Sequence, residues 1–380
     1  MRIQIDGTNT QNKGAELMAY TIIQQIEQKF PDAEIVLNLY GNDFRVGECK
    51  AKITQPLRLK HFRYPRAILY RLGLPYSYFT EYYPSKKIDI LLDASGFKFG
   101  DQWSYSKTYM DALENYYAKL KSYNTQIVLL PQAFGPFTTE SSKRSIDILN
   151  KYVDIFFARE SKSHQHLIES GISANKIFEY PDFTITAKGY VSERFKHLKD
   201  FVCLIPNSKM LSHSGTNFDI YSKLFERIEQ KCSLHGKKAF LLNHEGEDDF
   251  DLCNRINGRL ANKLPIVNQV NALEVKGLIG NSYMVISSRF HGVSSALNQA
   301  IPCLATSWSH KYQYLFQEFG LTNNIINVSE NIVTEDNRVD QLLTDESNKN
   351  VRHFLGHRKH ILLDKVEDMW KVVWNNVNQK

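Results

Sequence analysis

The chain has 380 residues, which is more than one hydrophobic core usually serves, so two domains are expected. An apolar content of 42% and a charged content of 23% are ordinary for a soluble globular enzyme and argue against disordered and fibrous classes. The net charge of +6 favours anionic partners such as phosphate compounds or acidic lipid, and it does not single out nucleic acid.

Strands and helices alternate through the first half of the chain. Residues 2–6 predict a strand that ends at Asp6, and a polar turn over residues 7–14 leads into a helix that runs to about residue 30. Further strands are predicted at 35–39, 88–93, 127–130 and 154–158. Further helices are predicted at 107–122 and 161–170. This alternation is typical of a parallel sheet with crossover helices.

The pattern pauses near residues 182–200 and then restarts. Its later strands are predicted at 201–205, 239–242, 284–286 and 302–305. The sequence therefore predicts an α/β fold of two Rossmann-like doubly wound domains, residues 1–190 and 191–345, that face each other across a cleft. Residues 346–380 predict closing helices that could pack back on the first domain.

Cysteine usage and the start of the chain indicate a cytoplasmic location. The cysteines are scattered, odd in number and never in a C-x-x-C pair, so we expect reduced residues without a disulfide framework or a zinc cluster. They are Cys49, Cys203, Cys232, Cys253 and Cys303. The first residues lack the apolar core of a signal peptide, and no run approaches the ~18 apolar residues that span a bilayer.

Ligands of open α/β sheets bind beyond the carboxyl ends of the strands, which directs attention to Arg289 and His291. Both follow the strand at 284–286 and precede a helix of small residues. A guanidinium near a helix N-terminus favours phosphate or carboxylate, and the imidazole can transfer a proton near neutral pH. Alternatively, the arginine pairs with a surface carboxylate and the histidine with a loop carbonyl.

Two other cations follow strands in the same way. Arg159 comes directly after the strand at 154–158, with Ser161 or Ser163 as a helix cap, and it could instead pair with Glu160 or Asp182. Lys311 begins a predicted helix, where a lysine is poorly placed for the helix dipole, so it favours an anion-binding role over that of a solvated lysine. No segment predicts a metal site.

Together these segments resemble the polysaccharide pyruvyl transferase family over roughly residues 1–320. The segments that carry the resemblance, in chain order, are Asn12-Lys-Gly-Ala-Glu16, Asp93-Ala-Ser-Gly96, Pro131-Gln-Ala-Phe-Gly-Pro136, Ala158-Arg-Glu-Ser-Lys-Ser163, Gly171-Ile172, Pro181-Asp-Phe183, Ser288-Arg-Phe-His-Gly292 and Trp308-Ser-His-Lys311. The family fold is similar to that of the two-Rossmann-domain, GT-B-type glycosyltransferases. The resemblance implies an enzyme of polysaccharide biosynthesis that transfers the pyruvyl group of phosphoenolpyruvate to a sugar. It implies no cofactor, since phosphoenolpyruvate is a co-substrate.

The resemblance also assigns roles to residues. It implies donor binding by Arg159, Arg289 and Lys311, and it makes His291 the general acid. The acceptor or its loops would involve Asp6, Asn12, Glu16, Asp93, Gly96 and Gln132. The acceptor is expected to be a free or lipid-linked saccharide.

Two other functions remain open at the level of sequence. A GT-B-type glycosyltransferase could hold the diphosphate of a nucleotide sugar at the same helix N-terminus. A non-catalytic saccharide-binding relative is favoured by Ala15, where the family usually has Asp, and by Ser95, where it often has Gly.

Residues 49–80 combine cations with large apolar side chains and contain no acidic residue. This composition predicts either contact with an anionic membrane surface, at the inner face of the membrane, or simple packing on the first domain.

Overall fold

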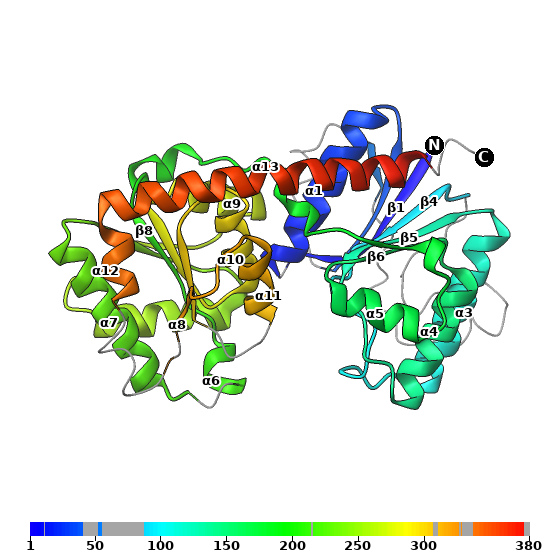
Figure 1. Ribbon diagram of the computed structural model, residues 1–380, viewed down its shortest axis with the longest axis horizontal. Coiled ribbons are helices and arrows are strands. Elements are labelled where there is room, and N and C mark those ends of the chain that lie inside the picture. Colours follow the sequence, from blue (N-terminus) through cyan, green and yellow to red (C-terminus); the bar gives the residue numbers. More distant parts are fainter. Residues whose placement is uncertain are drawn as a thin grey trace. The chain divides into compact units, whose positions relative to one another are not determined.

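The computed structural model describes residues 1–10, 12–40, 52–54, 87–213, 216–306, 311–326, 328 and 337–375. The chain divides into two compact units (Figure 1). Unit 1 consists of Met1–Thr10, Met18–Phe183 and Lys365–Lys380, and unit 2 consists of Gln11–Leu17 and Thr184–Asp364. The first turns of the N-terminal helix therefore belong to unit 2, although the strand before them belongs to unit 1.

Unit 1 is built on a parallel sheet whose described strands follow the order β3-β2-β1-β4-β5-β6-β7. The strands are β1 (Arg2–Asn9), β2 (Glu34–Tyr40), β3 (Lys52–Thr54), β4 (Ile90–Asp93), β5 (Gln126–Gln132), β6 (Ile155–Ala158) and β7 (Ile177–Glu179). In the register of β1 and β4, Asp6 lies opposite Asp93. Strand β1 runs past its predicted end at Asp6, with an irregularity between Ile5 and Thr8 where it pairs with β2.

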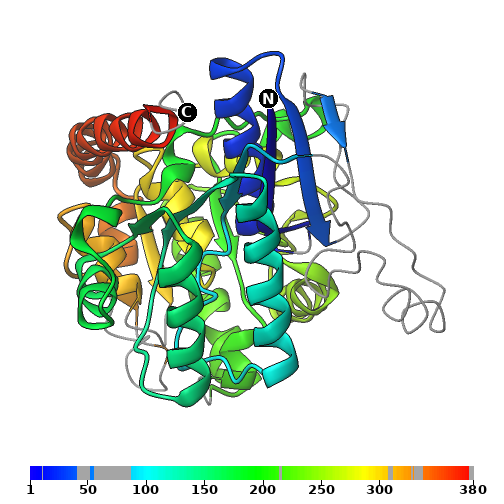
Figure 2. The same cartoon turned by 90° about the vertical axis from the view of Figure 1, so that its right-hand side faces the viewer.

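Helices cover both faces of this sheet (Figures 1 and 2). The helices are α1 (Lys13–Lys29), α3 (Lys107–Ser122), α4 (Glu140–Tyr152) and α5 (Ser161–Glu169). Helices α3 and α4 lie side by side and share a buried core with the strands, to which Leu113, Tyr117 and Leu149 contribute. Burying such side chains gives about 1.5–3 kcal/mol each, so the apolar side of α3 holds the helix in place.

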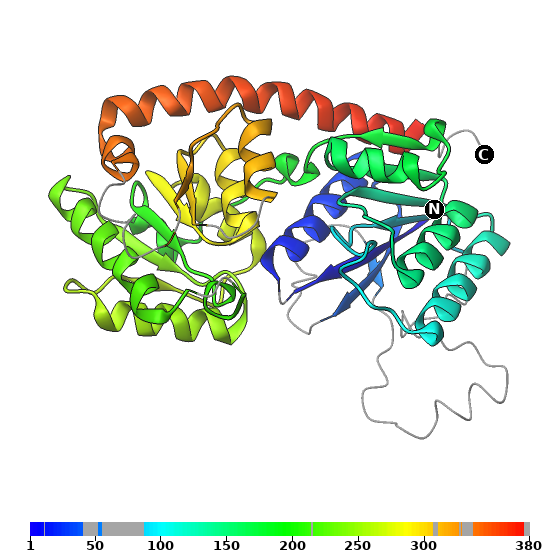
Figure 3. The ribbon, with the colours of Figure 1, turned by 60° about the horizontal axis from the view of Figure 1, so that its bottom comes forward.

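Unit 2 repeats the architecture, with described strands in the order β10-β9-β8-β11-β12-β13, all parallel (Figure 3). These strands are β8 (Val202–Ile205), β9 (Ala239–Leu242), β10 (Ile266–Val267), β11 (Met284–Ser287), β12 (Cys303–Thr306) and β13 (Ile325–Ile326). The helices are α6 (Lys209–His213), α7 (Phe218–Leu234), α8 (Gly246–Arg259), α9 (Ala272–Gly280), α10 (Phe290–Leu297), α11 (Lys311–Glu318), α12 (Arg338–Leu343) and α13 (Asp345–Asn375). The predicted α/β class and the predicted long strands are confirmed.

The four described cysteines are buried in unit 2 and form no disulfide. Cys203 and Cys303 lie on central strands and are fully buried, and burial raises the pKa of both thiols. Such thiols act as small apolar side chains, as the sequence predicted.

The last turns of α13 pack on unit 1 through tryptophans. Trp370 stacks on Trp374 with ring centroids 5.3 Å apart, and its edge meets Phe183 at 5.8 Å. Trp374 also contacts Phe30, which follows α1, at 5.4 Å. Residues 365–375 therefore complete the core of unit 1.

Replacing Trp370 by alanine should lower the free energy of unfolding by about 3–5 kcal/mol, because the side chain is 3% exposed and leaves a cavity. Urea unfolding followed by circular dichroism measures the change. The control is Ile361→Ala on the same helix, where a half-exposed side chain predicts a change of about 0.5 kcal/mol. Equal effects of the two substitutions would contradict the packing role.

Candidate functional site

Each sheet has one place where the strand order reverses. The reversal falls between β1 and β4 in unit 1 and between β8 and β11 in unit 2. In open α/β sheets the ligand crevice lies outside the carboxyl ends of the strands at this point. The side chains that follow these strands are therefore the first candidates in each unit.

In unit 2 the central feature of this edge is Arg289, the N-cap residue of α10. Its Nε donates to Asp249 at 2.8 Å, and its terminal nitrogens form ion pairs with Asp249 and Glu245. Asp249 is fully buried, while the Glu245 side chain is 29% exposed. Burial lowers the pKa of Arg289 to about 10, which leaves the guanidinium charged at neutral pH.

Three helices of unit 2 begin around this ion pair. Glu245 is the N-cap residue of α8, and its backbone forms an antiparallel bridge with Asn12. The Asn12 side-chain oxygen accepts hydrogen bonds from the backbone N–H groups of Gly14 at 2.8 Å and Ala15 at 3.3 Å, which caps α1. The amino ends of α1, α8 and α10 thus meet, and each carries partial positive charge.

Gly14 brings the start of α1 against His291. A Cβ atom at Gly14 would lie 2.1 Å from His291 Nδ1, so any other side chain at this position would displace the imidazole ring. Lys13 on the same turn donates to the buried Glu16 at 2.7 Å. The sequence grouped Asn12 and Glu16 with the acceptor residues of the first domain, whereas the structure places them in unit 2 with His291.

His244 belongs to the same edge and was not found from sequence. It follows β9, is 3% exposed, and its Nδ1 has no hydrogen-bond partner among the described residues. Burial, followed by the nearby charges of Arg289, His291 and Lys13, holds the pKa of this imidazole well below its usual value. His244 is therefore neutral at pH 7.

A hydrogen-bonded network fixes the backbone just before Arg289. The Ser288 carbonyl accepts hydrogen bonds from the Asn207 side chain and from the Tyr312 hydroxyl, both at 2.9 Å. The Ser288 hydroxyl bonds to Tyr221 on α7. Three elements in addition to β11 therefore hold the segment that presents Arg289 and His291.

In unit 1 the corresponding edge carries a buried carboxylate pair, Asp6 and Asp93. Asp6 accepts hydrogen bonds from the Tyr116 hydroxyl at 2.6 Å and from the Gln4 amide at 2.8 Å. Burial, outweighing these hydrogen bonds, raises the pKa of Asp6, and the charge of Asp93 adds to the rise. Lys98 approaches Asp93 at 3.5 Å and supplies the opposite charge.

The turn after β4 lies close to the end of β1. Gly7 has a φ of +79°, and a Cβ atom there would lie 2.3 Å from the Ser95 hydroxyl. The Ser95 backbone N–H donates to Asp93 at 2.9 Å, and the Gly96 carbonyl accepts from the N–H of Ala133 at 3.0 Å. The predicted residues Asp6, Asp93 and Gly96 are therefore brought together.

Gln132 ends β5, and Arg159 directly follows the neighbouring strand β6 at the same edge of the sheet. The Arg159 N–H donates to the Gln132 carbonyl at 3.1 Å, and the Arg159 guanidinium lies 3.7 Å from Glu160. The N-cap of α5 is Glu160, so the prediction of a serine cap was wrong. Ser163 instead donates to Glu160 and accepts from the backbone N–H of Phe134.

Some predicted residues lie outside the part of the chain that the structure describes. Lys311 begins α11 as predicted, but its side chain is not described. His310 and, apart from β3, residues 49–80 lie outside the described residues. Arg159 belongs to unit 1 and Arg289 to unit 2, so their convergence on one ligand stays a prediction.

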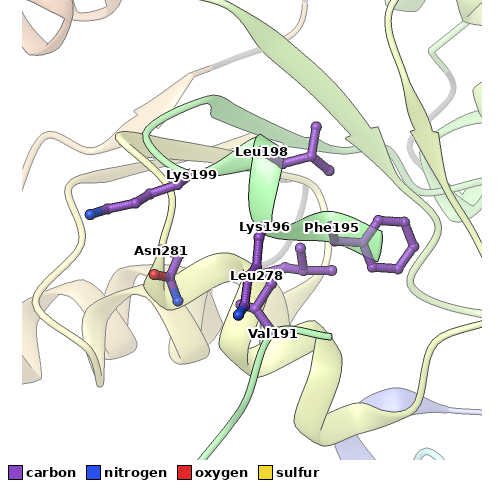
Figure 4. A pocket seen from close by; sticks show the side chains of 7 residues that line it. All are labelled: Val191, Phe195, Lys196, Leu198, Lys199, Leu278 and Asn281. Atoms are coloured by element: carbon purple, nitrogen blue, oxygen red, sulfur yellow. The ribbon is translucent and has the colours of Figure 1, made fainter. Parts of the chain in front are cut away.

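A pocket of about 280 Å³ in unit 2 lies away from these residues (Figure 4). Its lining includes Lys199 and Asn281, which precede β8 and β11, so it lies at the amino ends of the strands. That edge is opposite to the one where ligands of such sheets bind. In the described ranges, no three His, Cys, Asp or Glu side chains are grouped to hold a metal ion, and no helix is long and apolar enough to cross a bilayer.

Solved structures define the class of fold. A candidate UDP-N-acetylglucosamine 2-epimerase from Listeria monocytogenes matches with a TM-score of 0.62 at 14% identity, covering 100% of this chain and 97% of its own. The UDP-GlcNAc 2-epimerase of Methanocaldococcus jannaschii gives 0.60 at 13%, covering 99% and 100%. Anabaena HepE, solved with UDP and glucose, gives 0.59 at 11%, covering 100% of both chains. The fold is thus a two-domain α/β fold of the GT-B type.

The family follows from the sequence match. The model of the polysaccharide pyruvyl transferase family matches residues 12–310, which include Asn12, His244, Arg289 and His291. The chain belongs to this family, a family of transferases in polysaccharide biosynthesis.

The neutral state of His244 predicts a pH dependence of stability. The pKa of His244 is lower in the folded than in the unfolded state, so its contribution is present above about pH 6.5 and is lost as the pH falls. Between pH 7.5 and 5.5 the wild type should lose about 1.4 kcal/mol more stability than His244→Gln. Urea unfolding at both pH values measures this, with His197→Gln at an exposed position as control. Parallel losses in wild type and His244→Gln would contradict it.

Proposed function

We propose that this chain transfers the pyruvyl group of phosphoenolpyruvate to a saccharide, forms a ketal and releases phosphate. The observation that carries the proposal is the unit 2 edge, where the amino ends of α1, α8 and α10 meet around Arg289 and His291. The membership of the chain in the polysaccharide pyruvyl transferase family supports this reading.

The donor is a small molecule with a phosphate and a carboxylate, and this edge suits an anion. Helix amino ends attract anions, and an arginine fork can bind phosphate through two parallel hydrogen bonds. Buried Asp249 holds one side of the Arg289 guanidinium, and the more exposed Glu245 holds the other. In the proposal the donor phosphate takes the place of Glu245, while Asp249 keeps the fork oriented.

His291 acts as the general acid in this scheme. Its proton goes to the methylene carbon of phosphoenolpyruvate, which becomes the methyl group, and C2 becomes electrophilic. A sugar hydroxyl adds to C2 and loses its proton, the bond from C2 to the phosphate oxygen breaks, and a second hydroxyl closes the ketal. Neighbouring His244 is neutral, so it does not add a second cation that could bind the donor in place of Arg289.

Unit 1 suits the acceptor. Its edge carries the Asp6 and Asp93 carboxyl groups, Lys98 and the Gln132 amide, which can exchange hydrogen bonds with hydroxyl groups. Arg159, whose backbone N–H bonds to the Gln132 carbonyl, lies on the same edge. The scheme uses no nicotinamide and no nucleotide.

The test is phosphate release from phosphoenolpyruvate, measured with free and lipid-linked saccharides. Release should require both substrates, and His291→Ala should lower kcat about 10²–10⁴-fold while leaving phosphoenolpyruvate binding intact. His197→Ala, at an exposed position of unit 2, serves as control. Stabilisation by a nucleotide sugar but not by phosphoenolpyruvate would instead indicate a glycosyltransferase.

Gly14→Ala should separate activity from stability. The added methyl group displaces the His291 ring, so kcat should fall at least about 10-fold. Alanine is preferred over glycine in helices by about 1 kcal/mol, so the fold should be retained. Gly258→Ala in α8 is the matched control, because a Cβ atom there meets nothing within 4 Å. Full activity of Gly14→Ala would show that its contact with His291 is unimportant.

A further inference from the structure

The loop that follows β4 in unit 1 exposes aromatic side chains. Phe97 is 43% exposed and Trp103 is 44% exposed, and they are the exposed large aromatic residues among the described residues of this unit. Exposed apolar groups that cluster on one loop mark interaction sites more often than scattered ones do. The loop begins directly after Asp93, at the reversal of strand order.

These rings are held in place rather than free. The Trp103 indole N–H donates to the Phe97 carbonyl at 2.8 Å. Trp103 stacks on Tyr105 at 6.3 Å between ring centroids, and Tyr105 stacks on Tyr109 of α3 at 4.3 Å. The Tyr105 hydroxyl donates to the Lys98 carbonyl at 3.0 Å. A rigid aromatic face binds a ligand with little loss of side-chain entropy.

Several buried polar atoms near the loop have no hydrogen-bond partner among the described residues. Within the described part of the chain, the Tyr117 hydroxyl, the Ser95 hydroxyl and both amide atoms of Gln132 are buried and form no hydrogen bond. The Tyr117 hydroxyl interacts electrostatically with Lys98 and with Asp93, which places it in the same cluster. Leaving such groups unsatisfied costs stability, so they point to a ligand with several hydroxyl groups.

Gln132 connects the cluster to the loop. Ala133, the next residue, donates its N–H to the Gly96 carbonyl at 3.0 Å, and Phe99 pairs with Phe134 as a short bridge. The loop thus runs alongside the extension of β5. The aromatic residues, the polar cluster and Arg159, which bonds to the Gln132 backbone, are all parts of unit 1.

We propose that this loop is a saccharide subsite, with Phe97 and Trp103 packing on the C–H face of a sugar ring and with Gln132, Ser95, Tyr117 and Lys98 binding its hydroxyl groups. An aromatic face together with hydrogen-bond donors and acceptors matches the amphipathic surface of a sugar ring. The identification of this sugar as the acceptor rests on the proposed function; the binding of a sugar does not.

The first pair of variants uses the buried amides of β5. Gln132→Leu keeps the side-chain volume and removes an unsatisfied amide, so the variant should fold at least as stably as the wild type. It should nevertheless weaken saccharide binding at least about 5-fold. Gln126→Leu is the matched control, because Gln126 is also buried with an unpartnered amide oxygen among the described residues, but lies at the opposite end of the strand.

The second pair uses exposed side chains of unit 1. Trp103→Ala should weaken saccharide binding about 10-fold and leave the melting temperature close to that of the wild type. Ile168→Ala, which removes a side chain 41% exposed on α5, should change neither. Saccharide binding by both pairs of variants is compared by saturation-transfer NMR of the full chain with neutral oligosaccharides and without phosphoenolpyruvate. Binding of phosphoenolpyruvate is measured separately, by thermal shift.

The outcomes separate the two proposals. Saccharide signals that weaken in Trp103→Ala and Gln132→Leu, with unchanged stabilisation by phosphoenolpyruvate, support the subsite. If they weaken although no saccharide stimulates phosphate release, the subsite stands and the pyruvyl transfer fails. Equal signals in all variants, or no saccharide signal from the wild type, overturn the subsite whether or not phosphate is released.

Discussion

The buried ion pair between Arg289 and Asp249 is the contact on which the candidate donor edge depends. Asp249 lies in the first turn of α8, so the pair joins the starts of α8 and α10, and Glu245 extends the connection through Asn12 to the start of α1. Breaking a buried pair by removing one partner leaves an uncompensated charge, which costs about 3–5 kcal/mol. The same contact therefore stabilises unit 2 and orients the Arg289 guanidinium.

The two units present different electrostatics at corresponding edges of their sheets. Unit 2 combines helix amino ends with Arg289, His291 and a neutral His244, which favours an anion. Unit 1 combines two carboxyl groups, one lysine and hydroxyl or amide groups. The first six strands of unit 1 and the six described strands of unit 2 follow the same order. The difference in electrostatics between the two edges therefore comes from the residues that follow the strands.

Much of the fold could be predicted, because short apolar runs and helical periodicity depend on neighbouring residues alone. Strands β7, β10 and β13 have two or three residues, too few to show a pattern. His244 and Glu245 directly follow a predicted strand, and the rule that selected Arg289 would also have selected them. The assignment of Gln11–Leu17 to unit 2 could not be predicted, because it depends on the contact of Asn12 with Glu245, 233 positions away. The cluster of Gln4, Tyr116 and Asp6 likewise joins residues from different elements.

In the proposed mechanism, a proton is delivered to the methylene carbon of phosphoenolpyruvate at the unit 2 edge. This step is tested by running the reaction in D₂O with phosphoenolpyruvate labelled with ¹³C at that carbon, followed by NMR of the saccharide product. We expect a ketal methyl group that carries solvent deuterium, and loss of this product in His291→Ala. A pyruvylated product whose methyl group contains no deuterium, or one formed equally well by His291→Ala, would contradict it.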